Sequence, residues 1–348
     1  MKEIPVGILG ATGMVGQHFI RFLEGHPWFK LAWLGASDRS AGKKLKDATA
    51  WRLDGEMPDS AAELFVFESK PDRAPRLVFS AMDASVATEI ERDFARAGHI
   101  VVSNSRNHRM EPDVPLLVPE INPSHLSLIH HQQKHCGWKG MIVTNPNCST
   151  VVLTMALAPL SRFGIEKVIA TTLQAVSGAG YPGVASMDVL ANVIPFIPGE
   201  EEKMERETQK ILGSMSQGRV VALNATVSAH CNRVAVADGH MVAASVGFSS
   251  KPRIEDMQRA FDEFRGIPQE RNLPSAPARP IVYMPQQDRP QPRRDASREN
   301  GMTVFVGRVR ECPVLDAKFV ACGHNTIRGA AGAAVLNAEL MVSEGFLD

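Results

Sequence analysis

The chain has 348 residues, enough for two domains that each bury a hydrophobic core. Its 38 basic and 38 acidic residues cancel, so it lacks the positive excess that nucleic acids and anionic membranes attract. No apolar run approaches the roughly 20 residues that cross a bilayer, and the N-terminus leads straight into a strand-like segment. We therefore expect a cytoplasmic protein with neither a nucleic-acid partner nor a membrane partner.

The N-terminal part alternates between two kinds of segment. Strand-like apolar runs cover residues 4–10, 30–36, 76–81 and 99–103, and helical apolar spacing covers 14–23 and 84–97. This alternation predicts a parallel sheet with crossover helices, the Rossmann type of α/β fold. We expect this domain to span residues 1–146.

After about residue 145 the pattern becomes richer in strands, with few helices between them. Strand-like runs cover residues 167–176, 219–229, 240–249 and 303–310. The Pro- and Arg-rich stretch 268–294 contains the apolar Ile281-Val-Tyr283 and is expected to be an ordered arm. We expect a mixed α+β domain over 147–324, followed by a closing helix in 325–348 that completes the first domain.

The first predicted turn between strand and helix reads Gly10-Ala-Thr-Gly13-Met-Val-Gly16. Glycines at this spacing let the backbone approach a pyrophosphate at a helix N-terminus. The alternative is a tight turn that binds no ligand.

The segment after the second strand is Ser37-Asp-Arg39-Ser40. Hydroxyl groups and a guanidinium suit the 2′-phosphate of NADP. Asp38 could instead hold the bare ribose of NAD, so NADP is favoured and NAD remains a weaker alternative.

Cys148 lies where a strand-like run, 141–143, gives way to a helix-like run, 151–157. At a helix N-terminus a thiolate is stabilised by the dipole and the backbone N–H groups, which could also hold an oxyanion. The alternative is a buried, inert thiol.

Several motifs together resemble the aspartate-β-semialdehyde dehydrogenases, in particular the branch found in archaea and fungi. The resemblance covers nearly the whole chain and is carried by Gly10-Ala-Thr-Gly13-Met-Val-Gly16, Ser37-Asp-Arg-Ser-Ala-Gly42-Lys, Ser103-Asn-Ser with Arg109-Met, Asn145-Pro-Asn-Cys148-Ser-Thr150, Gln174-Ala-Val-Ser-Gly-Ala-Gly-Tyr181, Gly199-Glu-Glu-Glu-Lys203, Cys231-Asn-Arg233, Asp238-Gly-His240 and Asn325-Thr-Ile-Arg-Gly-Ala-Ala-Gly332. It implies that Cys148 attacks an acyl phosphate, that phosphate leaves, and that NADPH reduces the resulting thioester to an aldehyde.

Arg233 and His240 are separated by a short segment ending in Asp238-Gly239, which predicts adjacent strands joined by a turn. The resemblance makes His240 the general base and Arg233 the arginine that holds the substrate carboxylate. From the residues alone, a histidine at a surface turn is the alternative.

The resemblance implies further roles. Gln174 orients the acyl intermediate, Arg109 and Lys203 bind the leaving phosphate, and Glu200 receives the substrate ammonium, although acidic residues also favour a solvated helix start. The predicted catalytic residues are Cys148, His240 and Gln174, and the predicted substrate-binding residues are Arg233, Glu200, Arg109, Lys203 and Asn147. The predicted cofactor contacts are Gly10, Thr12, Gly13, Met14, Val15, Ser37, Arg39, Ser40, Ser80, Ser177, Gly178 and Asn325.

No metal is expected. His131 and His135 are four residues apart, but the segment between them lacks the acidic residue of a zinc-protease motif. Cys231 lies in a strand-like run and is expected to be structural.

The predicted reaction is the NADP-dependent reductive dephosphorylation of L-aspartyl-4-phosphate to L-aspartate 4-semialdehyde, which supplies lysine, threonine and methionine biosynthesis. Inorganic phosphate is the other small-molecule partner, and analogy predicts a homodimer or homotetramer. The alternatives are a malonyl-coenzyme A reductase, which uses the same cysteine chemistry, and a dinucleotide-binding protein without catalysis.

Overall fold

The computed structural model describes residues 3–347, and these form two compact units. The first consists of the described parts of Met1–Leu117, Ser124–Asn145 and Ala334–Asp348, and the second of Val118–Pro123 and Pro146–Ala333. The expected domain boundary lay at residue 146 with 325–348 returning to the first domain. In the structure only Ala334 onward joins the first unit, and the short segment Val118–Pro123 joins the second.

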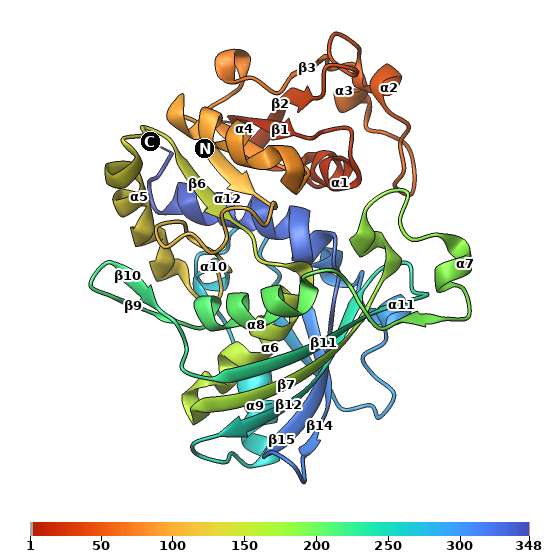
Figure 1. Cartoon of the computed structure of the whole chain (residues 1–348), viewed down its shortest axis with the longest axis vertical. Coiled ribbons are helices and arrows are strands. Elements are labelled where there is room, and N and C mark those ends of the chain that lie inside the picture. Colours follow the sequence, from red (N-terminus) through yellow and green to blue (C-terminus); the bar gives the residue numbers. More distant parts are fainter. Residues whose placement is uncertain (1–2, 348) are drawn as a thin grey trace. The chain divides into compact units, whose positions relative to one another are not determined.

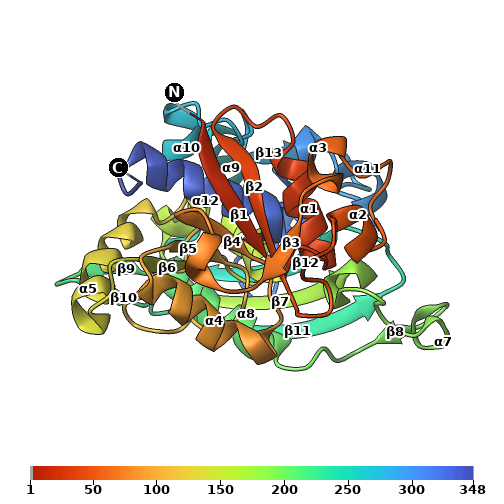
Figure 2. The same cartoon turned by 90° about the horizontal axis from the view of Figure 1, so that it is seen from above.

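The first unit contains a six-stranded sheet in which every neighbouring pair is parallel (Figures 1 and 2). Its strands, in spatial order, are β3 (Val66–Glu68), β2 (Phe29–Ala36), β1 (Ile4–Leu9), β4 (Leu77–Ser80), β5 (Ile100–Ser103) and β6 (Met141–Thr144). The chain order reverses between β1 and β4, and ligands of such sheets bind beyond the carboxyl ends of the strands at that point. The predicted parallel Rossmann-type sheet is confirmed.

Helices cover both faces of this sheet, as neighbouring residues of β4 show. Phe79 stacks on Phe19 of α1 (Met14–Leu23) at 5.0 Å between ring centroids. Val78 instead belongs to a buried cluster with Phe94 of α4 (Ala84–Arg96). Because successive strand residues point to opposite faces, α1 and α4 lie on opposite sides of the sheet. The remaining helices of the unit are α2 (Leu45–Ala48), α3 (Asp59–Ala62), α5 (Leu128–Cys136) and most of α12 (Gly332–Ser343).

The second unit is built on a mixed seven-stranded sheet (Figure 1). Its strands, in spatial order, are β13 (Ile281–Met284), β14 (Val304–Glu311), β15 (Ala317–Gly323), β12 (His240–Phe248), β7 (Ile165–Gln174), β11 (Thr226–Val234) and β8 (Val193–Ile194). A separate hairpin pairs β9 (Ser214–Ser216) with β10 (Arg219–Val221). The helices are α6 (Cys148–Leu157), α7 (Ser186–Val189), α8 (Glu200–Ile211), α9 (Ile254–Glu263), α10 (Ile267–Glu270) and α11 (Pro292–Asp295).

Helix α6 is the centre of this unit. All nine of its residues after Cys148 are buried. A helix that is apolar on every side can only exist inside a core, and α6 packs against β12, α8 and β15. The helix therefore holds Cys148 on a rigid support.

Two predictions about strands are wrong. The run 219–229 is not one strand, because its first residues form the hairpin strand β10 and its last begin β11. Strands β11 and β12 are not adjacent, because β7 lies between them and pairs with β11 in parallel and with β12 antiparallel. The segment joining β11 to β12 passes beyond the end of β7, where its carbonyls accept from the N–H groups of Val176 and Ser177. It is therefore a crossover connection and not a hairpin turn.

The structure also refines the C-terminal part. The arm 268–294 is ordered, as expected, and contributes β13 and parts of α10 and α11. The closing helix was expected from Asn325, but Ile327–Ala331 form a π-helical turn and the α-helix begins only at Gly332. Single π-turns inside helices are frequent at functional sites.

Candidate active site

Cys148 is the first residue of α6, and Asn147 caps this helix. The Asn147 Oδ1 atom accepts hydrogen bonds from the backbone N–H groups of Ser149 (2.9 Å) and Thr150 (3.1 Å). The cap therefore satisfies these two of the N–H groups at the helix start, and the expectation that this N-terminus holds an oxyanion stays a prediction. The helix dipole still favours a thiolate at Cys148.

Helix α8 fixes the same cap from a second direction. The Nδ2 atom of Asn147 donates to Glu200 Oε1 at 2.6 Å, and its backbone N–H donates to Glu207 Oε2 at 2.6 Å. Both carboxylates are buried. Charge-assisted hydrogen bonds of this length are strong, so α8 locks the backbone beside Cys148. Glu207 was not identified from the sequence.

The π-helical turn closes one side of Cys148. A methyl group at Gly329 would lie 2.6 Å from the Cys148 Cβ atom, so no larger residue fits there. The turn is held by Arg328, whose Nη1 and Nη2 atoms donate to the two Glu120 oxygens at 2.8 and 2.7 Å. Both side chains are completely buried. Only the motif around Asn325 pointed to this segment, and the partner Glu120 was not predicted.

Three predicted residues lie together at one end of the sheet. Gln174 ends β7, Arg233 is paired with it on β11, and His240 begins β12 on the other side of β7. The backbone of Ala175 joins the two outer residues: its N–H donates to His240 Nδ1 (3.1 Å), and its carbonyl accepts from Arg233 Nη1 (2.7 Å). The structure therefore brings Arg233 and His240 together even though their strands are not neighbours.

Gly178 lies directly over this pair. A Cβ atom there would lie 2.9 Å from Arg233 Nη1 and 3.0 Å from His240 Nε2. The His240 Nε2 atom is buried and has no hydrogen-bond partner among the described residues. A buried nitrogen without a partner costs free energy, which a substrate or cofactor that bonds to it would recover.

Electrostatics couple these groups. Burial, assisted by the neighbouring Arg233 charge, lowers the pKa of His240 to about 3, so the imidazole is neutral near pH 7. Burial also lowers the pKa of Arg233, and Cys148 and Glu200 oppose that shift. Cys148 thus acts on the same guanidinium that lies beside His240.

Glu200 and Lys203 form an ion pair in the first turn of α8. The Lys203 Nζ atom lies 2.9 Å from Glu200 Oε2, while Oε1 accepts from Asn147. Burial would raise the pKa of Glu200, but Lys203 and Asn147 together outweigh it, and the pKa lies below its usual value. Glu200 is buried and ionised, so it is not the solvated helix start that composition alone allows.

Asn325 supports the site through its amide group. Its Oδ1 atom accepts from the Gly239 N–H and its Nδ2 atom donates to Ser177 Oγ, both at 2.8 Å. It therefore links the segment before His240 to the 3₁₀ turn that contains Gly178.

The first unit holds the predicted dinucleotide turn. Gly10 has φ +75° and its missing side chain would strike the Ala81 carbonyl, while Gly13 has no atom nearer than 3.5 Å to an added Cβ. Helix α1 has neither a side-chain cap nor an acidic residue in its first turn. Its N-terminus, which carries Met14 and Val15 and follows Thr12, therefore suits an anion.

The other first-unit residues divide between two places. Ser37, Asp38 and Arg39 are exposed beyond the end of β2, and Ser40 is half-buried. The Asp38 Oδ1 atom accepts from the Arg39 N–H at 2.8 Å, so this carboxylate is partly engaged by its own turn. Ser80, at the end of β4, is buried.

Arg109 is buried in the loop after β5, and its Nη2 atom donates to the Asn104 carbonyl at 2.8 Å.

The second thiol near the site differs from Cys148. Cys231 is buried in β11, and burial raises its pKa to about 11, which suits the structural role expected for it. His230, the neighbouring residue of β11, is exposed.

No helix among residues 3–347 is both long and apolar enough to span a membrane.

The comparisons with known proteins agree with one another. Residues 5–129 match the family model described as "Semialdehyde dehydrogenase, NAD binding domain", and residues 157–328 match "Semialdehyde dehydrogenase, dimerisation domain". The chain is 50% identical to aspartate-semialdehyde dehydrogenase of Methanothermobacter thermautotrophicus, over 97% of this chain and 99% of that protein. It is 48% identical to the same enzyme of Cryptococcus neoformans, over 99% and 98%.

Solved structures show the same likeness. The crystal structure of the Candida albicans enzyme with NADP matches with a TM-score of 0.92 and 43% identity, covering 99% of both chains. The Vibrio cholerae aspartate semialdehyde dehydrogenase II complexed with ASA matches with a TM-score of 0.78 and 26% identity, covering 99% of this chain and 100% of that one.

Proposed function

The chain belongs to the aspartate-semialdehyde dehydrogenase family, and on this premise we propose that it reduces L-aspartyl-4-phosphate to L-aspartate 4-semialdehyde through a thioester on Cys148. The observation that carries the mechanism is the placement of Cys148 at the capped start of a buried helix, electrostatically coupled to Arg233, which lies beside His240. Because the relatives are named aspartate-semialdehyde dehydrogenases, the two alternatives are disfavoured: a malonyl-coenzyme A reductase and a non-catalytic binding protein.

Cys148 provides the nucleophile. Its sulfur forms a bond to the acyl carbon, the bond from that carbon to the phosphate oxygen breaks, and inorganic phosphate leaves with the electron pair. The rigid cap and the close contact with Gly329 hold the Cβ atom in place, so the sulfur can approach the carbon in one orientation.

His240 accepts the thiol proton at its Nε2 atom. In the substrate-free protein the low pKa makes His240 a poor base, and Arg233 contributes to that. A substrate carboxylate bound to Arg233 would cancel the guanidinium charge and raise the pKa of His240 towards the working pH. Burial, the larger cause of the low pKa, remains, so we infer that substrate binding makes His240 a stronger base than it is in the substrate-free protein.

The remaining polar groups match the rest of the substrate. Arg233 would hold the α-carboxylate, Glu200 the ammonium, and Arg109 with Lys203 the phosphate, while Gln174 lies at the strand end beside Arg233. In the substrate-free protein Glu200 is already paired with Lys203. Binding of phosphate to Lys203 would release one Glu200 oxygen for the ammonium.

The chain contains a nicotinamide-dinucleotide-binding domain, and we propose NADP as its cofactor. When bound, NADPH supplies the hydride that reduces the acyl carbon. The open N-terminus of α1 would hold the pyrophosphate, and Ser37, Arg39 and Ser40 the 2′-phosphate. The engagement of Asp38 with its own turn supports NADP over NAD.

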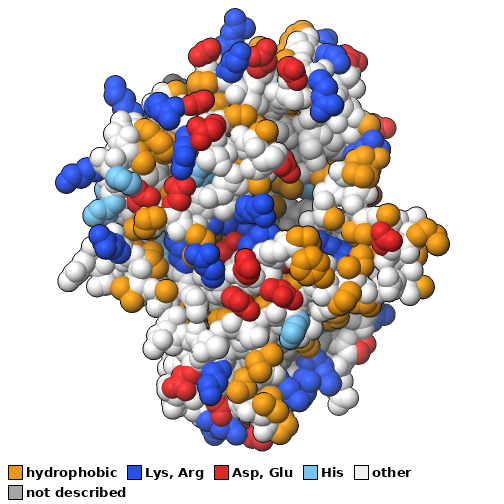
Figure 3. Space-filling model, in the orientation of Figure 1, with side chains coloured by type: hydrophobic (Ala, Val, Ile, Leu, Met, Phe, Trp, Pro, Cys, Tyr) orange, Lys and Arg blue, Asp and Glu red, His pale blue; other side chains and the backbone are white. Residues whose placement is uncertain are grey.

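The second unit also offers a surface for a second copy of the chain. Apolar side chains gather around α7 and β8 (Figure 3), where Tyr181, Met187, Leu190, Val193 and Phe196 are exposed. Outward-facing Ile169 and Leu173 on β7 are partly exposed as well. An apolar patch of this kind marks an interface. We propose a homodimer formed through this unit, which light scattering after size exclusion would test.

The direct assay is the reverse reaction. Aspartate semialdehyde and NADP should give NADPH only when inorganic phosphate is present, and malonyl-coenzyme A should be reduced far more slowly than aspartyl phosphate. A faster malonyl-coenzyme A reaction would overturn the substrate assignment while leaving the cysteine chemistry standing.

Glu200→Gln tests the ammonium contact. Loss of a charge-assisted hydrogen bond should cost about 1.5–3 kcal/mol, or roughly ten- to a hundredfold in kcat/KM for the semialdehyde. Lys203→Ala is the matched comparison, and it should chiefly raise the KM for phosphate. Unchanged binding of the semialdehyde in Glu200→Gln would remove Glu200 from the substrate site.

A further inference from the structure

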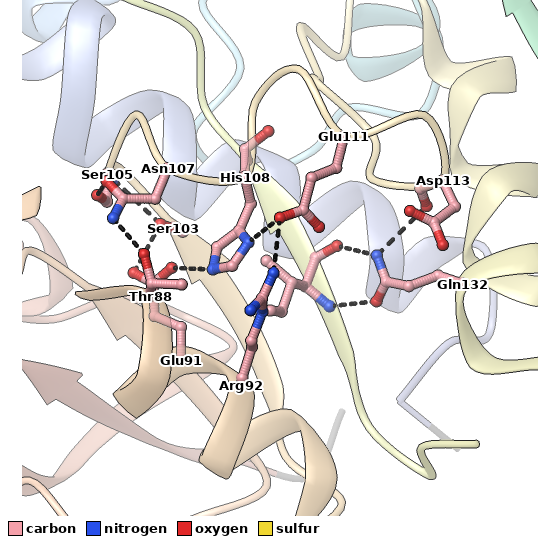
Figure 4. Close-up of polar contacts among 12 residues, drawn as sticks. Thr88, Glu91, Arg92, Ser103, Ser105, Asn107, His108, Glu111, Asp113 and Gln132 are labelled. Carbon is pink, nitrogen blue, oxygen red and sulfur yellow. Dashed lines mark hydrogen bonds and ion pairs between the residues drawn. The ribbon is translucent and has the colours of Figure 1, made fainter. Parts of the chain in front are cut away.

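The loop that follows β5 contains a buried acid–base cluster that the proposed mechanism does not use. His108 lies between two carboxylates (Figure 4): its Nδ1 atom is 2.8 Å from Glu111 Oε1, and its Nε2 atom is 3.5 Å from Glu91 Oε2. His108 and Glu91 are completely buried, whereas Glu111 is about one-third exposed and also accepts from Arg92 at 3.2 Å. We call His108, Glu91 and Glu111 the loop clamp.

The loop is fastened before His108 to Glu91 and to the first turns of α4, and after it the Glu111 N–H donates to the His108 carbonyl at 3.1 Å. Ser103 donates to Glu91 Oε1 at 2.7 Å and accepts from the Ser105 N–H at 3.0 Å. Asn107 donates to the Ala84 carbonyl at 2.7 Å and to Thr88, which ties the loop to the first turns of α4 (Figure 4). The backbone entering and leaving His108 is therefore fixed.

Stability alone does not explain the clamp. Burial raises the pKa of Glu91, and its polar and charged neighbours, Ser80 first among them, only partly offset that shift. Buried acid–base pairs contribute little net stability, because desolvation cancels most of their attraction. Such groups are better explained when they hold a single conformation that the function needs.

Arg109, the next residue, is the group that the clamp would fix. Its guanidinium rests on the Asn104 carbonyl at 2.8 Å. Asn104 is held in turn by the Ser80 carbonyl, which accepts from its backbone N–H (3.0 Å) and from its Nδ2 atom (3.1 Å). The clamp therefore lies beside the backbone of Arg109, and the Asn104 carbonyl accepts from the end of its side chain.

We propose that His108 is a positioning residue that holds Arg109 ready for the phosphate group, through its contacts with Glu91 and Glu111. This inference rests on the proposed function, in which Arg109 contacts phosphate. Without the clamp, ordering of the long arginine side chain would be a cost of binding. Loss of the clamp should therefore change the KM for phosphate and leave the KM values for aspartate semialdehyde and NADP unchanged.

Two substitutions separate the contacts of His108. His108→Leu removes both and should raise the KM for phosphate about tenfold, which corresponds to about 1.4 kcal/mol. The KM values for aspartate semialdehyde and NADP, and kcat at saturating phosphate, should stay within about twofold. His108→Asn places an amide near the former Nδ1 position, keeps the Glu111 contact and should show a smaller increase. His131→Leu, an exposed histidine on α5, is the control and should change nothing.

The decisive test is a double-mutant cycle with Arg109→Ala. If His108 acts through Arg109, His108→Leu should add nothing to the phosphate KM of the Arg109→Ala variant. Additive effects, or equal changes in all three KM values, would overturn the proposal and reduce His108 to a structural residue. If His108→Leu fails to fold by circular dichroism, Glu91→Gln takes its place in the cycle with the same criterion.

The same measurements distinguish failure of the proposed function. A wild-type chain without phosphate-dependent activity would refute the function itself. A phosphate KM that is unchanged in Arg109→Ala, with activity intact, would refute the role of Arg109 and the positioning proposal with it, while the cysteine chemistry would stand.

Discussion

Around Cys148 the functional groups are held by buried charged and amide side chains. The turn between β1 and α1 is instead shaped by glycines, with the Thr12 carbonyl accepting from Thr49 Oγ1 at 3.1 Å and from Gln17 Nε2 at 3.4 Å. Asn147, Glu200, Glu207, Arg328 and Glu120 are all committed to buried hydrogen bonds near the thiol. The dinucleotide turn has no side-chain cap. A covalent step needs fixed angles at one atom, while a pyrophosphate can be bound by several backbone N–H groups at once. Substitutions should therefore affect catalysis and cofactor binding separately.

The largest expected effect is that of Cys148→Ala. Removal of a nucleophile should lower kcat by a factor on the order of 10⁴ to 10⁶, because no other described thiol stands at the capped helix start. The dissociation constant for NADP, measured by fluorescence titration, should change little. Substantial turnover in this variant would refute the thioester route.

A pair of glycine substitutions sharpens the contrast. In Gly178→Ala the new methyl group would press on Arg233 and His240, and overpacking of this kind costs about 1–3 kcal/mol, or roughly ten- to a hundredfold in kcat/KM. In Gly13→Ala the methyl group meets no atom within 3.4 Å, so only cofactor binding should weaken. Because Gly178 is itself a predicted cofactor contact, Gly13→Ala decides the test, and a loss of kcat at saturating NADP in that variant would contradict the separation.

Arg39→Ala should have a smaller and more selective effect. Arg39 is exposed, so its contact with a 2′-phosphate should contribute about 1.5 kcal/mol, near the lower end for charge-assisted bonds. NADP binding should therefore weaken about tenfold while NAD binding stays nearly constant. Equal losses for both cofactors would place Arg39 away from the 2′-phosphate.

The smallest effect concerns acid stability. His240 has a pKa of about 3 in the folded chain and roughly 6.5 when unfolded, so the unfolded state takes up a proton that the folded state refuses. The free energy of unfolding should fall as the pH drops below 6.5, by about 1 kcal/mol at pH 5.5 from this group. In His240→Gln, the free energy of unfolding measured with urea should lose this part of its fall at low pH. If it falls as steeply as in the wild type, groups other than His240 cause the acid sensitivity.

The sequence predicted those features that local patterns determine. The glycine turn, α1, α4 and the parallel sheet depend on spacing within about 20 residues, and so does the start of α6 at Cys148. The family resemblance identified Arg233 and His240, but the adjacent-strand model for them failed. Pairing of β11 with β7 over eight residue pairs outweighed the local preference of Asp-Gly for a hairpin turn.

The supports of the site could not be predicted, because their partners are distant in sequence. Glu120 and Arg328 are 208 residues apart, and Asn147 and Glu207 are 60 apart. The loop clamp is closer in sequence but involves a histidine and two carboxylates without a known spacing. Such contacts form only when the fold brings the segments together. Secondary-structure propensity and apolar periodicity are local properties of the sequence, so they cannot predict these contacts.

The thioester on Cys148 is the central claim, and mass spectrometry tests it most directly. Aspartate semialdehyde and NADP without phosphate should leave an aspartyl group on the protein, because oxidation proceeds but no phosphate is present to release the acyl group. Peptide mapping should place this adduct on Cys148, and added phosphate should remove it. An adduct on Cys231, or steady phosphate-dependent turnover with no adduct on any cysteine, would contradict the account.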